Sequence, residues 1–203
     1  MNRQDTQMSF FSTPITGPPG LRYQPDFIET DAEKELIEKI RGLPLVPFQF
    51  GAFEGKRRVA WLGWRYDYSQ HKLKQADPIP TWLAPVIAKI QDLANLPQAS
   101  IAQILCTEYE MGVGIGWHRD KPHFGDVFGL SLASACKLRF RRRSGDKWER
   151  FNLDVLPRSL YMMTGEARHQ WEHSIPPLQQ LRYSITFRTM AADKETGRQI
   201  PAP

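Results

Sequence analysis

Two segments in the first half of the chain place apolar residues at helical spacing. The first begins at Thr30-Asp31-Ala32-Glu33, which matches a capping box, where the Thr and Glu side chains satisfy each other's backbone donors. Its apolar positions are Leu36, Ile37 and Ile40, and Gly42 with Pro44 predicts its end. The second runs from about Pro80 to Asn95, with an apolar face of Leu83, Val86, Ile87, Ile90 and Leu93. We expect both helices to cover a core and to carry no chemistry.

Short runs rich in aromatic and β-branched residues predict strands. Two runs, residues 48–53 and 57–68, lie between the helices. From Ser100 onward further runs follow at short intervals, at residues 100–109, 127–134, 137–143, 150–156, 159–165 and 182–190. Many short strands without intervening helices favour a sandwich, a barrel or a jelly roll. The predicted fold class is α+β and mainly β, a jelly roll with the N-terminal helices packed on the outside.

The length of 203 residues suits one domain with tails. Residues 1–20 are polar and end in Gly17-Pro18-Pro19-Gly20, so we expect a flexible tail, with a second one at residues 191–203. Residues 21–190 then form a single domain, divided into an N-terminal extension (21–99) and a β core (100–190).

Three features bear on the cellular setting. No apolar run approaches the roughly 18 residues of a membrane span, and the N-terminus lacks the apolar stretch of a secretory signal. Cys106 and Cys136 are too few for a disulfide scaffold. We therefore expect no membrane association and a cytoplasmic location.

The net charge of +5 is concentrated in one segment. Residues 137–150 contain seven basic and two acidic residues, with aromatic residues between them. Ser144-Gly145-Asp146-Lys147 predicts a hairpin turn inside the segment. A basic stripe of this kind suits a polyanion such as nucleic acid, and it equally suits a solvated hairpin that keeps a sheet edge soluble.

Four of the five histidines lie in the β half, and His118-Arg119-Asp120 places an imidazole and a carboxylate two residues apart. On an extended segment both side chains point to one side and can share a metal. His173 supplies a third ligand, and two His with one carboxylate are typical of non-haem Fe(II) oxygenases. A zinc pair of His169 and His173 at helical spacing is the competing interpretation.

The segment Arg182-Tyr183-Ser184-Ile185-Thr186-Phe187-Arg188 alternates polar and apolar residues. On a strand, both arginines share one face with Ser184 and Thr186. Arginine suits bidentate recognition of a carboxylate. The alternative is a half-exposed edge strand with solvated arginines.

Together these motifs resemble the AlkB family of Fe(II)/2-oxoglutarate-dependent dioxygenases. The resemblance rests on Tyr109, His118-x-Asp120, His173 and RYSITFR, and it extends from about Gly20 to Met190. It implies a double-stranded β-helix, Fe(II) bound by His118, Asp120 and His173, and O₂ as oxidant. It also implies a 2-oxoglutarate site formed by Thr107, Tyr109, Arg182, Ser184 and Arg188. The run Gly165-Glu166-Ala167-Arg168 resembles the family segment that leads to the second histidine and favours His173 over His169.

The chain departs from the family pattern in three places. Thr107 and Ser184 stand where the family has Asn, and both keep a hydrogen-bonding group. Pro122 stands where well-studied members carry an acidic residue that contacts the base.

The resemblance also suggests substrate contacts. Leu62-Gly63-Trp64 is similar to the family segment whose Trp stacks on the target base, although a core-packing Trp fits the sequence as well. The expected substrate-binding residues are Trp64, Tyr66, Arg141, Arg142 and Arg143.

The resemblance implies oxidative demethylation of N-alkylated nucleobases in DNA or RNA. The partner would be single-stranded nucleic acid or a flipped-out base, with no obligate protein partner. One alternative is a dioxygenase acting on N-methyl groups of tRNA or protein. The other is a basic nucleic-acid-binding β module without catalysis, whose histidines are satisfied core residues.

Overall fold

The computed structural model describes residues 16–50 and 52–191. Three α-helices are α1 (Thr30–Arg41), α2 (Ala84–Ala94), which follows a 3₁₀ turn at Thr81–Leu83, and α3 (Gly165–His169). The strands before α2 are β1 (Leu21–Gln24), β2 (Val46–Phe50), β3 (Phe53–Asp67) and β4 (Lys72–Gln75). Those after α2 are β5 (Ile101–Tyr109), β6 (Ile115–His118), β7 (Phe124–Leu132), β8 (Cys136–Ser144), β9 (Lys147–Val155), β10 (Leu160–Met163), β11 (Glu172–Ile175) and β12 (Arg182–Met190).

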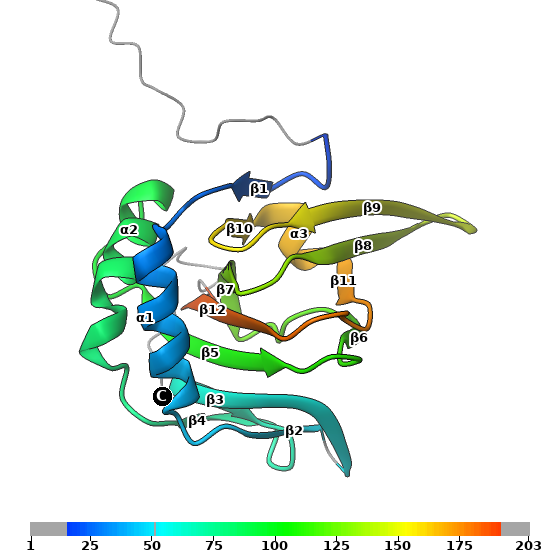
Figure 1. Cartoon of the computed structure of the whole chain (residues 1–203). Coiled ribbons are helices and arrows are strands. Elements are labelled where there is room, and N and C mark those ends of the chain that lie inside the picture. Colours follow the sequence, from blue (N-terminus) through cyan, green and yellow to red (C-terminus); the bar gives the residue numbers. More distant parts are fainter. Residues whose placement is uncertain (1–15, 51, 192–203) are drawn as a thin grey trace, which may run out of the picture.

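The strands form two antiparallel sheets (Figure 1). The larger sheet has the order β1-β10-β7-β12-β5-β3-β2, with β4 paired to β3, and the smaller has the order β6-β11-β8-β9. Buried residues of β8 and β9, such as Leu138 and Val155, share one apolar cluster with Val127 of β7 and Met163 of β10. The sheets therefore pack face to face, as in a jelly roll, and the predicted fold class is confirmed.

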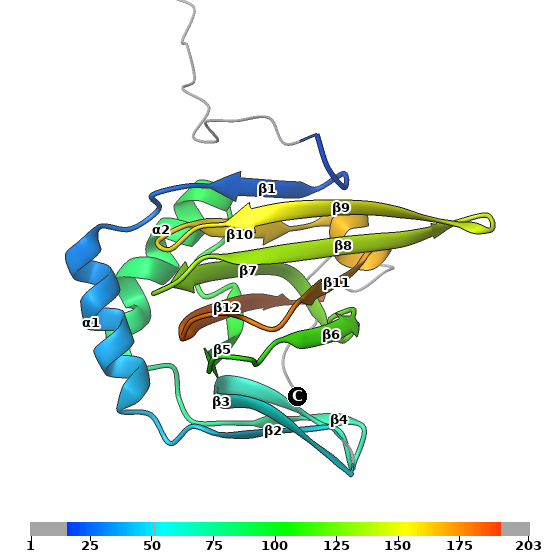
Figure 2. The ribbon, with the colours of Figure 1, turned by 45° about the vertical axis from the view of Figure 1, so that its right-hand side comes forward.

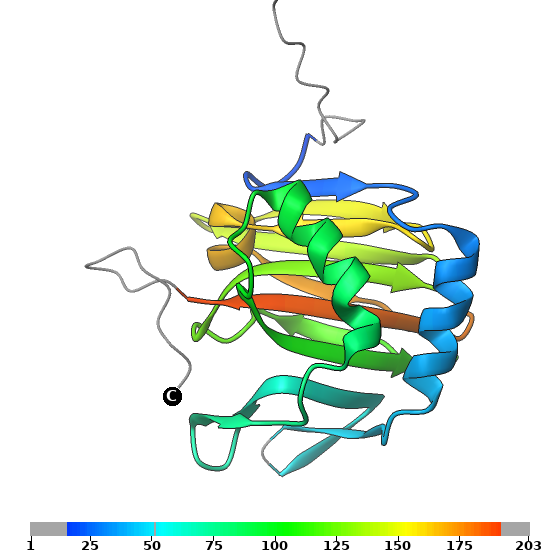
Figure 3. The same cartoon turned by 90° about the vertical axis from the view of Figure 1, so that its left-hand side faces the viewer.

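The helices α1 and α2 cover the outer face of the larger sheet (Figure 3). Leu36 and Ile40 of α1 and Ile90 of α2 belong to the same buried cluster as Ile104 of β5 and Ile185 of β12. Fully burying one such side chain contributes roughly 1.5–3 kcal/mol. Both helices thus cover a core, as the spacing of their apolar residues predicts.

The predicted capping box at Thr30 is wrong. The residue before the helix is Glu29, and its side chain makes no capping hydrogen bond. The Glu33 carboxylate instead accepts a hydrogen bond of 2.8 Å from the backbone N–H of Ala133. Glu33 is buried against the loop between β7 and β8, so its tertiary partner replaces the local one.

The strand β12 lies between β5 and β7 in the middle of the larger sheet, and all nine of its residues are buried. Its polar face, with Arg182 and Ser184, points away from the helix-covered cluster that contains Tyr183, Ile185 and Phe187. The alternative of an edge strand with solvated arginines is therefore wrong.

The chain is already held in place before β1. The carbonyl oxygens of Pro19 and Gly20 accept hydrogen bonds from the backbone N–H groups of Ala167 and Thr164. Gly20 has φ +89, and a Cβ there would lie 2.1 Å from the Thr164 carbonyl oxygen. The last residues of the predicted N-terminal tail thus pack on the domain, while residues 1–15 and 192–203 lie outside the described part.

Within the described ranges, no helix is long and apolar enough to span a membrane. Both cysteines are free and buried.

Candidate functional site

A cavity of about 110 Å³ opens between the two sheets. Side chains from both sheets and from the β6–β7 loop surround it. Its lining includes Thr107, Tyr109, Ile115, His118, Asp120, Val127, Leu138, Tyr161, Met163, His173, Thr186 and Arg188. The cavity therefore contains each of the three predicted metal ligands.

The short strands β6 and β11 bring the two histidines together. His118 and His173 are directly opposite each other in the antiparallel pairing, and their ring centroids are 4.2 Å apart. Asp120 follows β6 by two residues, and its Oδ2 lies 3.7 Å from His173 Nε2. Residues 53 positions apart in sequence thus meet at one point.

The two oxygens of Asp120 have different surroundings. Oδ1 accepts hydrogen bonds from Arg188 Nη2 at 2.6 Å and from Arg188 Nε at 3.0 Å. Oδ2 is buried and has no hydrogen-bond partner in the described structure. An unpartnered buried carboxylate oxygen is costly, so Oδ2 fits a role as a metal ligand.

The protonation states suit metal binding. Burial would raise the pKa of Asp120, but Arg188 and the neighbouring histidines hold it well below its usual range. Burial and His118 lower the pKa of His173 to about 3, and burial also lowers the pKa of His118. All three groups are therefore in their deprotonated, ligating forms at neutral pH.

A hydrogen bond also orients His118, because its Nδ1 lies 2.9 Å from the Gly116 carbonyl oxygen. Nε2 is then the nitrogen available to a metal, as in many metal sites where the second ring nitrogen bonds to a carbonyl. Within residues 16–50 and 52–191, no group of three or more His, Cys, Asp or Glu side chains meets the geometric requirements of a metal site. The donor set nevertheless fits Fe(II), with two imidazoles and one free carboxylate oxygen.

A second unusual side chain, Arg182, lies directly behind Tyr109 of the cavity lining. Its side chain is 0% exposed, and its Nε donates to Ser131 Oγ at 3.2 Å. Both Nη atoms are buried without a hydrogen-bond partner in the described structure. The guanidinium lies over the Tyr109 ring, 5.3 Å from its centroid. A buried cation with two free donors fits a carboxylate ligand.

Thr107 and Ser184 are both buried and lie opposite each other on β5 and β12. Of the two, Thr107 lines the cavity. The two arginines of β12 do not converge: Arg188 is occupied by Asp120 and by Gln103 Oε1 at 2.8 Å, whereas Arg182 is not.

Comparison with known proteins agrees with this geometry. A family model for the 2OG-Fe(II) oxygenase superfamily matches residues 20–188. The chain belongs to this superfamily.

Within the superfamily, the oxygenase is similar to AlkB homologues. It is 29% identical over 182 residues to the "Alkylated DNA repair protein ALKBH8 homolog" of Arabidopsis thaliana, covering 78% of this chain and 51% of the relative. It is 31% identical over 168 residues to "tRNA (carboxymethyluridine(34)-5-O)-methyltransferase ALKBH8" of Mus musculus, covering 79% and 24%. The chain thus spans about half of the plant protein and about a quarter of the mouse protein.

A solved structure titled "The structure of OsALKBH1" shares the fold with a TM-score of 0.67 at 17% identity. The match covers 87% of this chain and 99% of that one. These matches identify an AlkB-family oxygenase with the jelly-roll fold.

The outer part of the oxygenase cavity is aromatic. It is lined by Phe48, Trp61, Tyr66 and Tyr68, and Lys121 Nζ lies 4.7 Å from the ring centroids of both tyrosines. Of the two aromatic residues on β3 that the sequence predicts to contact the substrate, Tyr66 lines the cavity and Trp64 does not. Trp64 pairs with Gln75 of β4, whereas Trp61 pairs with Leu105 above the cavity. The register of β3 therefore places Trp61, and not Trp64, in the cavity lining, and the substrate contact of Trp64 stays a prediction.

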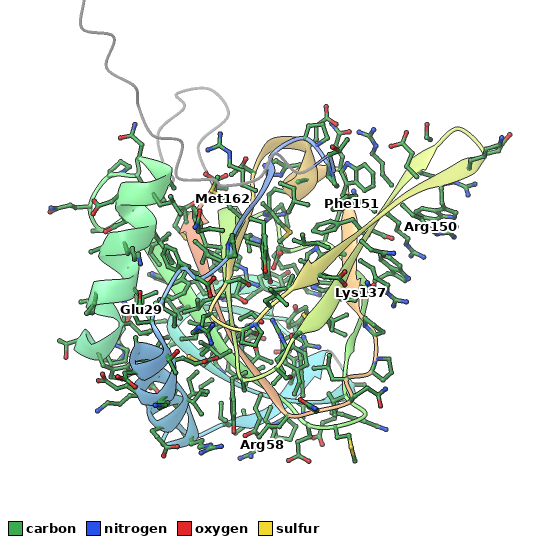
Figure 4. The ribbon with its side chains drawn as sticks, turned by 45° about the horizontal axis from the view of Figure 1, so that its top comes forward. Glu29, Arg58, Lys137, Arg150, Phe151 and Met162 are labelled. Carbon is green, nitrogen blue, oxygen red and sulfur yellow. The ribbon has the colours of Figure 1, made fainter. Side chains whose placement is uncertain are left out.

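The arginine-rich hairpin β8–β9 projects from the oxygenase, as Figure 2 shows. Arg141 pairs with Glu172 at 2.6 Å, and Arg142 pairs with Glu149 and Glu166. Arg143 is exposed and lies over the Trp148 ring. Figure 4 labels Lys137 and Arg150, which lie on the two strands of this hairpin.

A surface cleft of about 440 Å³ lies beside the hairpin. It is lined by Arg119, Arg141, Arg142, Arg143, Trp148, His169, Gln170 and Glu172. Arg119 lines the cavity as well, so the cleft and the cavity meet at this residue. His169 is exposed at the end of α3, whereas His173 lies on β11, and the zinc pair is not formed.

Sequence reasoning missed Arg168, which is buried below the Asp120 loop. It donates four hydrogen bonds to backbone carbonyl oxygens of residues 120, 121, 124 and 125, at 2.7–3.3 Å. It therefore holds the loop that positions Asp120. Arg57, at the cavity wall, was missed too. The spacing of residues carries no sign of either role.

Proposed function

We propose that this AlkB-family oxygenase is an Fe(II)- and 2-oxoglutarate-dependent dioxygenase that removes alkyl groups from the nitrogens of nucleobases in DNA or RNA. The observation that carries the proposal is that two unsatisfied buried groups occur together, one in the cavity and one directly behind its lining. Asp120 Oδ2 lies beside two neutral imidazoles in the cavity, and the buried Arg182, with two free donors, lies over the ring of Tyr109, which lines the same cavity.

In this proposal His118, Asp120 and His173 hold Fe(II). Bound iron, with 2-oxoglutarate and O₂, supplies the oxidation of a C–H bond of the alkyl group. Arg182 anchors the distal carboxylate of 2-oxoglutarate, aided by Tyr109 and by the hydroxyl groups of Thr107 and Ser184. Arg188 keeps Asp120 ionised and oriented, and we also propose that it contributes to the 2-oxoglutarate site through its place in the cavity wall.

The aromatic outer part of the cavity supports a base as substrate. Phe48, Trp61, Tyr66 and Tyr68 offer flat surfaces on which an unpaired base can stack. A base has to leave its stack to reach an enclosed site, and a damaged or single-stranded base does so at the lowest free-energy cost. We therefore propose single-stranded or flipped-out bases as substrates.

The surface cleft beside the β8–β9 hairpin is evidence for a binding site for the nucleic-acid strand that flanks that base. Arg141 and Arg142 are partly neutralised by their ion pairs, whereas no carboxylate pairs with Arg119 or Arg143 in the described structure. We propose that these four arginines contact backbone phosphates that flank the target base. Such contacts weaken steeply as salt concentration rises.

A second candidate is a tRNA substrate. The support is the similarity to the ALKBH8 relative from mouse, whose name describes a tRNA methyltransferase. Because the chain covers about a quarter of that protein, we keep the two substrate classes as alternatives that experiment separates.

The decisive experiment measures 2-oxoglutarate turnover and formaldehyde release with methylated DNA, RNA, tRNA and peptide substrates in parallel. We expect formaldehyde from methylated nucleic acid, and loss of turnover in His118→Ala and Asp120→Ala. His169→Ala is the matched control and should retain turnover. Full activity of the Asp120→Ala variant would refute the metal site, and release from peptides alone would refute the nucleic-acid substrate.

A further inference from the structure

Positively charged side chains outnumber negatively charged ones in the cavity lining. Its lining contains one carboxylate, Asp120, and four cationic side chains, Arg57, Arg119, Lys121 and Arg188. Arg188 is paired with Asp120. The other three make no ion pair with a carboxylate in the described structure. An occupant of the outer cavity therefore meets an excess of positive charge.

Arg57 is the most confined of these three cations. It lies at the start of the segment of β3 that pairs with β5, and its guanidinium stacks 3.8 Å from the centroid of the Phe48 ring. The groups that act on it electrostatically are Tyr109, Tyr68, Arg188 and Asp120, which all belong to the cavity region. Burial of this guanidinium lowers the pKa of Arg57.

Cofactor binding does not cancel this excess. In the proposed function, His118, Asp120 and His173 would hold Fe(II), and Arg182 would hold the dianionic 2-oxoglutarate. These charges nearly balance one another, because two positive and two negative charges arrive together. Arg57, Arg119 and Lys121 remain as uncompensated cations near the aromatic surfaces of Phe48, Tyr66 and Tyr68.

Methylated bases fall into two groups that differ in net charge. 1-Methyladenine and 3-methylcytosine carry a positive charge near neutral pH. 3-Methyluracil, 3-methylthymine and 1-methylguanine are neutral, and each has a carbonyl oxygen next to the methylated nitrogen. A guanidinium only donates hydrogen bonds, so it matches these carbonyl oxygens and repels a cationic base.

We propose that Arg57 makes the oxygenase selective for neutral or anionic alkylated bases that present a carbonyl oxygen beside the alkylated nitrogen. The inference rests on the proposed function for the existence of a base substrate, and it adds the class of base. Like charges within about 10 Å at the effective dielectric constant of a protein surface weaken binding by about tenfold. The expected discrimination is therefore at least of that order.

The test uses four single-stranded oligonucleotides that differ only in one base: 3-methyluracil, 1-methylguanine, 1-methyladenine or 3-methylcytosine. We expect kcat/KM for the two neutral bases to exceed that for the two cationic bases by about tenfold or more. Arg57→Gln should reduce this ratio, Arg57→Lys should keep most of it, and Arg57→Glu should reverse it.

Arg65→Gln is the matched control, because Arg65 is an exposed arginine on the same strand and is not among the cavity-lining residues. It should leave the ratio unchanged. The KM for 2-oxoglutarate should stay the same in Arg57→Gln. A large rise in that KM would assign Arg57 to the 2-oxoglutarate site and overturn the proposal.

A binding measurement separates this inference from the proposed function. Fluorescence anisotropy with the Mn(II)-loaded protein, without O₂, reports base preference even if no oligonucleotide is turned over. Absence of turnover alone contradicts the proposed function. Equal binding of cationic and neutral bases, or the same ratio in wild type and Arg57→Gln, contradicts the role of Arg57.

Discussion

Single residues in this oxygenase are held by partners that sequence spacing does not reveal. Asp120 is a clear case, because one of its oxygens is fixed by Arg188 while the other is left unpartnered. The HxD spacing predicts the ligand, but the arginine that orients it comes from β12, 68 residues away. Arg168 adds a second support through the backbone of the same loop.

Arg168→Met should weaken metal binding without removing a ligand. The substitution leaves buried carbonyl oxygens near Asp120 without their donor, at a cost of roughly 1–3 kcal/mol for each group left unsatisfied. Loss of a supporting hydrogen bond near a metal site typically reduces affinity 10- to 100-fold. Titration with Mn(II), followed by EPR, measures the change.

The control for this variant is Arg158→Met, since Arg158 pairs with Asp26 near α1 rather than with the Asp120 loop. It should lower stability slightly and leave Mn(II) affinity as it is. Equal affinity in both variants would show that Arg168 has no positioning role.

The buried thiol of Cys106 predicts sensitivity to alkaline pH. Burial raises its pKa to about 12 from a reference value of 9.0. Since the folded-state pKa is the higher one, the stabilisation is complete below about pH 9 and is lost as pH rises toward 12. Between pH 8 and pH 10 this group should account for a loss of about 1 kcal/mol.

Urea denaturation at pH 8 and pH 10 measures that loss. Cys106→Ala should show a shallower decrease than wild type, whatever its absolute stability. An identical decrease in both proteins would mean that Cys106 is not the group responsible.

At the level of elements, the longer strands and the two main helices follow from the sequence, because their apolar periodicity is complete. The strands β6 and β11 have only four residues each and were not predicted. Glycines interrupt the first and prolines follow the second, so local signals suggest loops. Their strand geometry comes from pairing with each other and with β8, which a local pattern cannot show.

This pairing makes a prediction for Gly114→Ala. A Cβ at position 114 would lie 2.4 Å from the Ile175 carbonyl oxygen, so β11 would have to move away from β6. Because those strands carry His173 and His118, we expect metal affinity to fall at least tenfold, together with a loss of stability of about 1–3 kcal/mol.

Gly116→Ala is the matched control for that variant. A Cβ at position 116 meets nothing within 4 Å, and the carbonyl that orients His118 is retained. Mn(II) titration should give the wild-type value for Gly116→Ala. A comparable loss in both variants would mean that strand separation is not the cause.

For the molecule as a whole, the hydrophobic core and the cavity are structurally linked, because the two faces of β12 contribute one to each. The fold class and the meeting of His118, Asp120 and His173 in one place were predictable, since they depend on periodicity and on a recognisable motif order. The aromatic lining was less predictable: the sequence suggests Trp64 as the residue that contacts the base, and the tryptophan that lines the cavity is Trp61. Which of two tryptophans faces inward depends on the register of β3, and that register is set by tertiary pairing.

Ligands that bind the folded state should stabilise the whole domain. At 100 times the dissociation constant a ligand adds about 2.7 kcal/mol, which corresponds to roughly 5–10 °C in Tm for a domain of this size. We expect Mn(II) and then 2-oxoglutarate to raise Tm in successive steps. Arg182→Met should keep the step from the metal and lose the step from 2-oxoglutarate.

Differential scanning fluorimetry measures both steps. The Ile185→Val variant serves as comparison, because it changes the helix-covered face of the same strand without removing the guanidinium, and it should keep both steps. If Arg182→Met keeps the full 2-oxoglutarate step, the anchoring role of Arg182 is refuted.

The central position of β12 has a consequence for biosynthesis. It is the last strand of the described chain and inserts between β5 and β7, so both neighbours have open edges until residues 182–190 leave the ribosome. Exposed strand edges invite pairing with other chains. A nascent chain that stalls before this point should therefore need chaperones and aggregate readily, and its helices would have half a sheet to cover.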